Sequence, residues 1–153
     1  MTLIALLIGI VLILTLGFAH HFGVLTIIRI TPHAEAKGHL AVLVTFAGLF
    51  ALHLAEILAF AVIFAGLLSF EALGSFTGSY TGSWADLIYF SGTNFVTLGY
   101  TGITVTGPIR IINMLQSLGG FMALTWSATL IYSVSGTAWH QGGYTSEESP
   151  ENA

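Results

Sequence analysis

Residues 93–102, Thr-Asn-Phe-Val-Thr-Leu-Gly-Tyr-Thr-Gly, carry the pattern in this chain that is best suited to chemistry. They lie between two long apolar segments, so small and flexible residues stand where a membrane interior is expected. Irregular backbone at that depth is tolerated only where it is buried in protein or lines a water-filled cavity. Rings of backbone carbonyls can replace the hydration shell of a potassium ion. The pattern therefore predicts a cation site made of main-chain oxygens.

Four consecutive residues of this run are expected to bind K+. The hydroxyl and carbonyl of Thr97 form the first group of ligands, and the carbonyls of Leu98, Gly99 and Tyr100 add further oxygen rings. Gly99 is needed because successive carbonyls point the same way only if some residues take positive φ, which is cheap only for glycine. The alternative is that Gly99 makes a simple turn. One loop cannot close a ring, so the mechanism implies a homotetramer.

The composition excludes a soluble protein. The chain is 55% hydrophobic and 7% charged, whereas soluble domains carry about 25% charged residues. Its net charge of −4 misleads, because three of the seven acids lie in the last residues, at Glu147, Glu148 and Glu151. The remainder is close to neutral, so no nucleic-acid partner is expected. There is no cysteine, and therefore no disulfide or thiolate metal site.

Three apolar stretches are long enough to cross a bilayer, which takes roughly 20 residues of helix. They are residues 3–28, 40–69 and 109–134. Residues 86–96 form a shorter apolar element, whose length suits a re-entrant half-helix. The first stretch lacks a basic start and a cleavage site, so a cleaved signal peptide is not expected. The predicted fold is an all-α membrane protein with three transmembrane helices and a re-entrant pore helix.

The chain divides into three predicted parts. Residues 1–39 form an N-terminal transmembrane helix and a cytoplasmic loop, residues 40–136 form a pore module, and residues 137–153 form a polar, disordered tail. Within the pore module, residues 70–84 are rich in Gly, Ser and Thr and are expected to be an exposed surface loop. Ser83 or Asp86 is expected to cap the short helix that follows.

The basic residues predict an orientation. Arg29 and Lys37 flank the first loop, which should therefore be cytoplasmic, although Arg110 opposes this assignment. The N-terminus then lies outside, the short helix enters from outside, and the C-terminus is cytoplasmic.

The order helix, outer loop, short helix, glycine-containing segment, helix resembles the pore module of the potassium channel superfamily. The resemblance covers roughly residues 40–134 and excludes the first helix. It rests on Thr97–Tyr100 and on the preceding aromatic-aromatic-Ser pattern of the pore helix, Tyr89, Phe90 and Ser91. Small bacterial ion channel proteins have a similar layout, with a last helix like Gly119-Gly120 and Trp126-Ser127-Ala128.

The resemblance implies a homotetrameric, potassium-conducting cation channel in the bacterial inner membrane. Its partners would be membrane lipid, monovalent cations and other copies of the chain, with no cofactor besides K+. Two alternatives stay open: a non-selective cation channel, and a non-conducting structural or binding protein on a channel-like scaffold. No nucleophile–base pair stands out, so an enzyme is not expected.

The segment departs from the family pattern in its outer half. Thr101 replaces the second filter glycine, and Gly102 replaces the acidic residue that follows. A β-branched residue at positive φ is costly. We therefore expect Tyr100 and Thr101 to take negative φ, with at least one outer carbonyl turned away from the axis and the Thr101 hydroxyl or water as an ion ligand in its place. Weaker selectivity for potassium, or an outer mouth that closes easily, would follow. The alternative is that Thr101 is accommodated without effect.

The last helix has a polar and small-residue face that is expected to line the inner pore. Gly119 and Gly120 form a gate hinge or, alternatively, allow close helix packing. Asn113 and Gln116 are expected to support the pore helix. The face comprises Asn113, Gln116, Ser117, Gly120 and Ser127.

Glu56 stands in the middle of the second span, with His53 one turn away. A charge there costs roughly 2.5–3.5 kcal/mol on insertion scales, so Glu56 must face protein. It is either a hydrogen-bonded link between helices or a pH sensor that supports the filter. His20 and His21, together with His53, raise a haem or metal alternative. That alternative leaves residues 97–100 unexplained.

Overall fold

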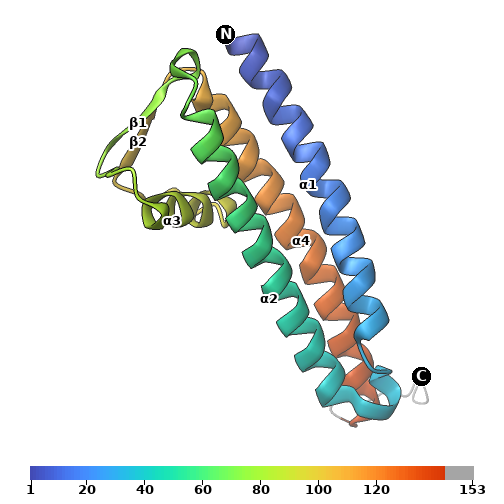
Figure 1. Ribbon diagram of the computed structural model, residues 1–153. Coiled ribbons are helices and arrows are strands. Elements are labelled where there is room, and N and C mark those ends of the chain that lie inside the picture. Colours follow the sequence, from blue (N-terminus) through green and yellow to red (C-terminus); the bar gives the residue numbers. More distant parts are fainter. Residues whose placement is uncertain (144–153) are drawn as a thin grey trace, which may run out of the picture.

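The computed structural model describes residues 1–143, which form three long helices running side by side (Figure 1). They are α1 (Thr2–Ile30), α2 (Ala34–Leu67) and α4 (Ile109–Gln141). Each is long and apolar enough to cross a membrane. The predicted class, a mostly helical protein with three candidate membrane spans, is confirmed at that level.

The long helices are apolar around most of their circumference, which is typical of helices that lie in lipid. On α1, for example, Leu14 and Phe18 are exposed although they are large and apolar. Small residues let the helices approach closely. A Cβ on Gly23 of α1 would lie 2.5 Å from a methyl carbon of Leu52 on α2, and one on Gly48 of α2 would lie 2.9 Å from Ile27.

A short helix, α3 (Trp84–Phe95), lies beside α2 and α4 at about the middle of their length (Figure 1). Ser83 caps it, as predicted, because its hydroxyl accepts a hydrogen bond from the Asp86 N–H at 3.1 Å. Two short strands lie on either side of α3 in the sequence. β1 (Ser75–Gly78) pairs antiparallel with β2 (Ile103–Thr106), and a 3-10 turn, η1 (Glu71–Leu73), precedes β1.

The expectation of an exposed loop over residues 70–84 is therefore wrong in part. Residues 75–78 form a strand, and the side chains of Leu73 and Phe76 are buried. The pairing partner of this strand lies in β2, beyond α3, and strands of four residues give little periodic signal in a sequence.

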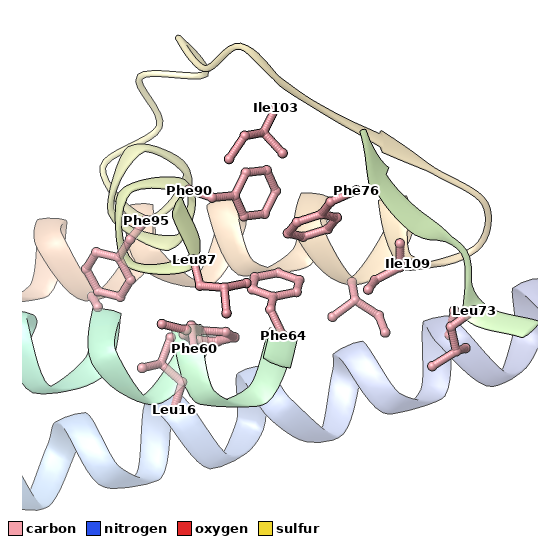
Figure 2. Packing of buried hydrophobic residues seen from close by; sticks show 14 residues of the cluster. Leu16, Phe60, Phe64, Leu73, Phe76, Leu87, Phe90, Phe95, Ile103 and Ile109 are labelled. Atoms are coloured by element: carbon pink, nitrogen blue, oxygen red, sulfur yellow. The ribbon is translucent and has the colours of Figure 1, made fainter. Parts of the chain in front are cut away.

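Aromatic rings hold α3 and β1 against α2 (Figure 2). The ring centroids of Phe76 on β1 and Phe90 on α3 are 4.4 Å apart. Phe64 on α2 lies 5.3 Å from Phe90 and 5.5 Å from Phe76. Aromatic pairs at these distances contribute about 0.5–1.5 kcal/mol beyond the burial of their surface. This cluster fixes the direction in which α3 points.

α4 extends past the predicted end of the pore module. Residues 137–141 are helical, so the expectation of disorder from residue 137 is wrong for them. Packing explains the extension, because Ala138 lies against Gly38 of α2, where a Cβ would come within 2.9 Å of the Ala138 Cβ. The rest of the predicted tail, from residue 144, lies outside the described residues.

The two ends of the bundle differ. The N-terminus lies at the same end as η1 and one end of the β1–β2 pair, and the turn between α1 and α2 lies at the other end with the end of α4 (Figure 1). This arrangement agrees with an odd number of membrane crossings. The orientation relative to a membrane stays a prediction.

Candidate functional site

α3 ends directly against the middle of α4. Phe95, its last residue, is buried, and a Cβ on Gly120 would collide with the Phe95 carbonyl oxygen. Glycine is therefore required at position 120 for this approach of one backbone to another. On the other side, a Cβ on Gly92 would be 3.7 Å from Ile57 of α2. The chain that leaves α3 thus begins in the interior of the bundle.

The next residues close the helix with a recognised C-terminal cap. The Leu98 N–H donates to the Thr93 carbonyl at 2.9 Å, and the Thr97 N–H donates to the Asn94 carbonyl at 3.0 Å. This is the pattern of a Schellman motif, whose next-to-last residue is left-handed and usually glycine. Here that residue is Thr97, with φ of 59°. A β-branched side chain in this conformation is strained, and the sequence did not predict it.

Gly99 also has positive φ, at 61°, which confirms the prediction for this residue. Over residues 1–143, Thr97 is the one non-glycine residue with positive φ. Tyr100 and Thr101 therefore lack positive φ, as predicted. Positive φ alternates at Thr97 and Gly99, with Leu98 between them. The assignment of K+ to these carbonyls stays a prediction.

Polar atoms in the outer part of the segment, residues 100–101, form hydrogen bonds within the chain. The Tyr100 carbonyl accepts a hydrogen bond from the Tyr89 hydroxyl at 3.2 Å. The Thr101 hydroxyl oxygen accepts one from the Ile103 N–H at 3.1 Å. These two bonds tie residues 100–101 to α3 and to the start of β2, whereas Leu98 and Tyr100 leave their side chains 68% and 84% exposed.

The predicted pore-helix residues divide between two faces of α3. Phe90 and Ser91 are buried, and Tyr89 is exposed. Asp86 lies at the N-terminal end, where its carboxylate accepts hydrogen bonds from the Thr81 hydroxyl at 2.6 Å and the Thr81 N–H at 2.8 Å. The bond from the Thr81 hydroxyl is the main reason that the pKa of Asp86 lies below its usual value.

Gln116 supports α3, as predicted. Its Nε2 donates to the Ser91 carbonyl at 3.1 Å, and both residues are buried. In the described part of the chain, three buried polar atoms near this contact have no hydrogen-bond partner: Ser91 Oγ, Asn113 Oδ1 and Gln116 Oε1. Among the described residues, the Asn113 side chain makes no hydrogen bond to α3.

The prediction that one face of α4 lines the inner pore is wrong for Gly120 and Ser127, because both are buried within the chain. Gln116, on the same face, is buried in its predicted supporting role. Gly119 is buried too, where a Cβ would lie 2.6 Å from Ile13 of α1. α4 is one unbroken helix through both glycines. These contacts favour close packing over a gate hinge at Gly119 and Gly120. The face of α4 that stays exposed includes Phe121, Thr125, Ala128 and Tyr132.

Glu56 faces protein, which confirms the prediction, and is 6% exposed. Its Oε2 is 3.0 Å from Nδ1 of His53, the expected partner, and its Oε1 is 2.8 Å from Nδ1 of His20 on α1. Nε2 of His20 is 3.4 Å from the hydroxyl of Ser127 on α4. We call His20, His53, Glu56 and Ser127 the histidine cluster. The sequence did not predict the contact of His20 with Glu56.

Aromatic rings surround the histidine cluster. The imidazoles of His20 and His53 are stacked, with centroids 5.5 Å apart and planes at 17°. The His20 ring is 5.5 Å from Trp126, and the His53 ring is 5.7 Å from Phe95, the last residue of α3. His21 is exposed and contacts Trp126 from outside the cluster.

The cluster has the composition of a metal site, since ligand atoms of His20, His53 and Glu56 lie within 4.8 Å of one another. Its geometry fits less well. The nearly parallel rings present their Nδ1 atoms side by side to two oxygens of one carboxylate. An ion held by the three residues would replace these two hydrogen bonds. The same arrangement differs from the haem alternative, in which two histidines face each other across an iron, so a hydrogen-bonded link between helices is favoured.

No protein-family model, curated protein or solved structure that was compared with the chain matches it.

Proposed function

We propose that the chain is one subunit of a homotetrameric channel for monovalent cations, with K+ as the principal ion. The observation that carries the proposal is the alternation of positive φ at Thr97 and Gly99, in an exposed segment at the end of a buried short helix. When positive and negative φ alternate along the backbone, successive carbonyls point to the same side. Such carbonyls from four chains would form the oxygen rings that a dehydrated cation needs.

The position of α3 supports a cation at this place. Its C-terminus carries a partial negative charge from the aligned peptide dipoles. The end is held within the bundle by Phe95 and by the bond from Gln116 to Ser91. Between α2 and α4, α3 would act as a re-entrant pore helix in the membrane.

The exposed surface of a single chain supports assembly. Leu98 and Tyr100 are exposed, and they lie in the same segment as the carbonyls that would bind ions. In the tetramer, neighbouring copies would cover these side chains, and the exposed face of α4, with Thr125 and Ala128, would border the water-filled path.

The test is ion flux into proteoliposomes under a potassium gradient. We expect potassium flux for the unchanged protein and its loss in Gly99→Ala, because alanine resists positive φ. Gly66→Ala is the matched control, since Gly66 has ordinary helical backbone and no atom within 4 Å of an added Cβ. Equal flux through Gly99→Ala would refute the site. Absence of flux from an intact tetramer would instead favour the non-conducting scaffold.

A second candidate, a channel that discriminates weakly among monovalent cations, is favoured by the outer part of the segment. Tyr100 and Thr101 lack positive φ, and their polar atoms bond within the chain. Fewer equivalent carbonyl rings then remain for K+.

The double change Thr101→Gly with Gly102→Asp tests this candidate. We expect a higher ratio of potassium to sodium flux than in the unchanged protein. Ser79 must adjust in the variant, because an added Cβ on Gly102 would lie 2.6 Å from its hydroxyl oxygen. Unchanged selectivity and conductance would show that the presence of Thr101 and Gly102, in place of the usual glycine and acidic residue, has no effect on ion conduction.

A further inference from the structure

The histidine cluster connects every helix of the subunit at one point. His20 belongs to α1, His53 and Glu56 to α2, and Ser127 to α4. The ring of His53 contacts Phe95, the last residue of α3. Because residue 96 follows directly, the side chain of Phe95 joins the cluster to the 96–101 segment.

The charge of the cluster depends on few groups. Glu56 is ionisable on α2, with His53 one turn away, and α1 contributes His20. The facing residues of α4 and α3, which are Trp126, Ser127 and Phe95, do not titrate in the relevant range. With both imidazoles neutral and the carboxylate ionised, the net charge is −1, and one added proton brings it to zero. A buried charge without a counter-charge is strongly destabilising, so this one proton stabilises the cluster most.

The structure offers a place for that proton. Both Nδ1 atoms face the carboxylate, so each neutral imidazole donates from Nδ1 and leaves its Nε2 free to accept a proton. On His20, Nε2 already faces the Ser127 hydroxyl at 3.4 Å. While His20 is neutral, the Ser127 hydroxyl can donate to Nε2. After protonation Nε2 would donate to that oxygen instead, and this charge-assisted bond would strengthen the link between α1 and α4. A cavity of about 70 Å³ between α1 and α4 adjoins His20 and leaves room for its ring to adjust.

We propose that the histidine cluster is a proton-operated latch, in which uptake of one proton by His20 strengthens the link between α1 and α4 and holds Phe95 and the 96–101 segment in the conducting arrangement. Loss of the proton leaves a net negative charge in the interior and loosens the contact of His53 with Phe95. This gives α1, which lies outside the pore module, a regulatory role. The effect on ions rests on the proposed function, whereas the proton site itself does not.

Fluorescence of Trp126 tests the proton site without any flux. In a protein with Trp84→Phe and Trp139→Phe, Trp126 is the one remaining indole and lies 5.5 Å from His20. A protonated imidazole quenches indole emission, so we expect the intensity to fall as pH is lowered and the cluster takes up its proton. The ring of His21, 5.7 Å from Trp126, adds its own contribution in this background. A flat trace would overturn the latch.

Two variants assign the transition. His20→Asn keeps an amide donor for Glu56 but cannot take up a proton, and should remove the part of the transition that comes from the cluster. His21→Asn is the matched control, because His21 also contacts Trp126 but lies outside the cluster, and should keep it. If His20→Asn fails to fold, the persistence of the transition in His21→Asn still assigns it to the cluster, and its loss there would overturn the proposal.

Potassium flux measured at pH 8 and pH 5.5 tests the regulation. We expect flux at least about 3-fold higher at pH 5.5, with the difference lost in His20→Asn and kept in His21→Asn. Flux that does not vary with pH would overturn the latch and leave the channel standing, whereas a fluorescence transition in a protein without flux would support the proton site and count against the channel. Stoichiometric Co²⁺ binding, lost in Glu56→Gln, would overturn the latch in favour of a metal centre.

Discussion

Two regions of this chain meet at Phe95, and they are built in opposite ways. The histidine cluster uses regular helices, and Glu56 finds both of its partners within one chain, at 2.8 and 3.0 Å. The 96–101 segment uses irregular backbone and leaves Leu98 and Tyr100 exposed. The cluster is complete in a single chain, whereas under the proposed function the segment would be completed by other copies of the chain.

The backbone shows the same contrast. Thr97 holds a conformation that its β-branched side chain disfavours, at φ of 59°. Strain of this kind persists only where the surrounding structure determines it, and it gathers at functional sites. Here the surrounding structure is the C-terminal cap of α3 and the close packing of Phe95 on Gly120.

The largest effect is expected where α3 meets α4. Gly120→Ala places a Cβ on the Phe95 carbonyl oxygen, which forces the two backbones apart. We expect a loss of about 1–3 kcal/mol in the free energy of unfolding, typical of overpacking, together with loss of flux. Reversible unfolding in mixed micelles measures the first quantity.

Gly136→Ala is the control for this change. It lies on the same helix and has no atom within 4 Å of an added Cβ, so it should be neutral or slightly stabilising, since alanine is the better helix former. If both substitutions lower the free energy of unfolding by the same amount, the close packing of Phe95 on Gly120 does not hold the two regions together.

A smaller effect is expected inside the histidine cluster. Glu56→Leu removes the acceptor for both imidazoles and should destabilise the subunit by about 1–2 kcal/mol, the range of hydrogen bonds between membrane helices. Ala55→Leu, an exposed neighbour on the same helix, provides the control and should change stability little. An equal effect of the two changes would mean that Glu56 contributes no link between helices.

The smallest effect concerns the strain at Thr97. Thr97→Gly should raise stability relative to Thr97→Ala by about 1 kcal/mol, because glycine takes positive φ without steric cost while alanine keeps its Cβ. Thermal unfolding of both variants measures the difference. Equal stabilities, or a more stable alanine variant, would show that the left-handed conformation at this position carries no strain.

Hydropathy and length predicted the three long helices and the short one, because the requirement to satisfy backbone groups in lipid leaves few choices. Ser83 was predictable as a cap, since its side chain acts on residues close in sequence. The burial of Glu56 followed from the cost of a charge in lipid.

Contacts between distant residues were not predictable in the same way. The bond of His20 to Glu56 depends on how two helices are rotated and shifted against each other, which one sequence does not specify. The same holds for the packing of Gly120 on Phe95, which buried a face of α4 that was expected to line a pore. The β1–β2 pair joins residues on opposite sides of α3, and its short strands gave no signal.

The central claim, that the 96–101 segment is completed by other copies of the chain, is tested most directly by the mass of the intact protein released from detergent micelles in native mass spectrometry. We predict a species with the mass of four chains of 16.2 kDa each, surviving at activation energies that strip bound lipid. A monomer or dimer as the only stable species would contradict the account.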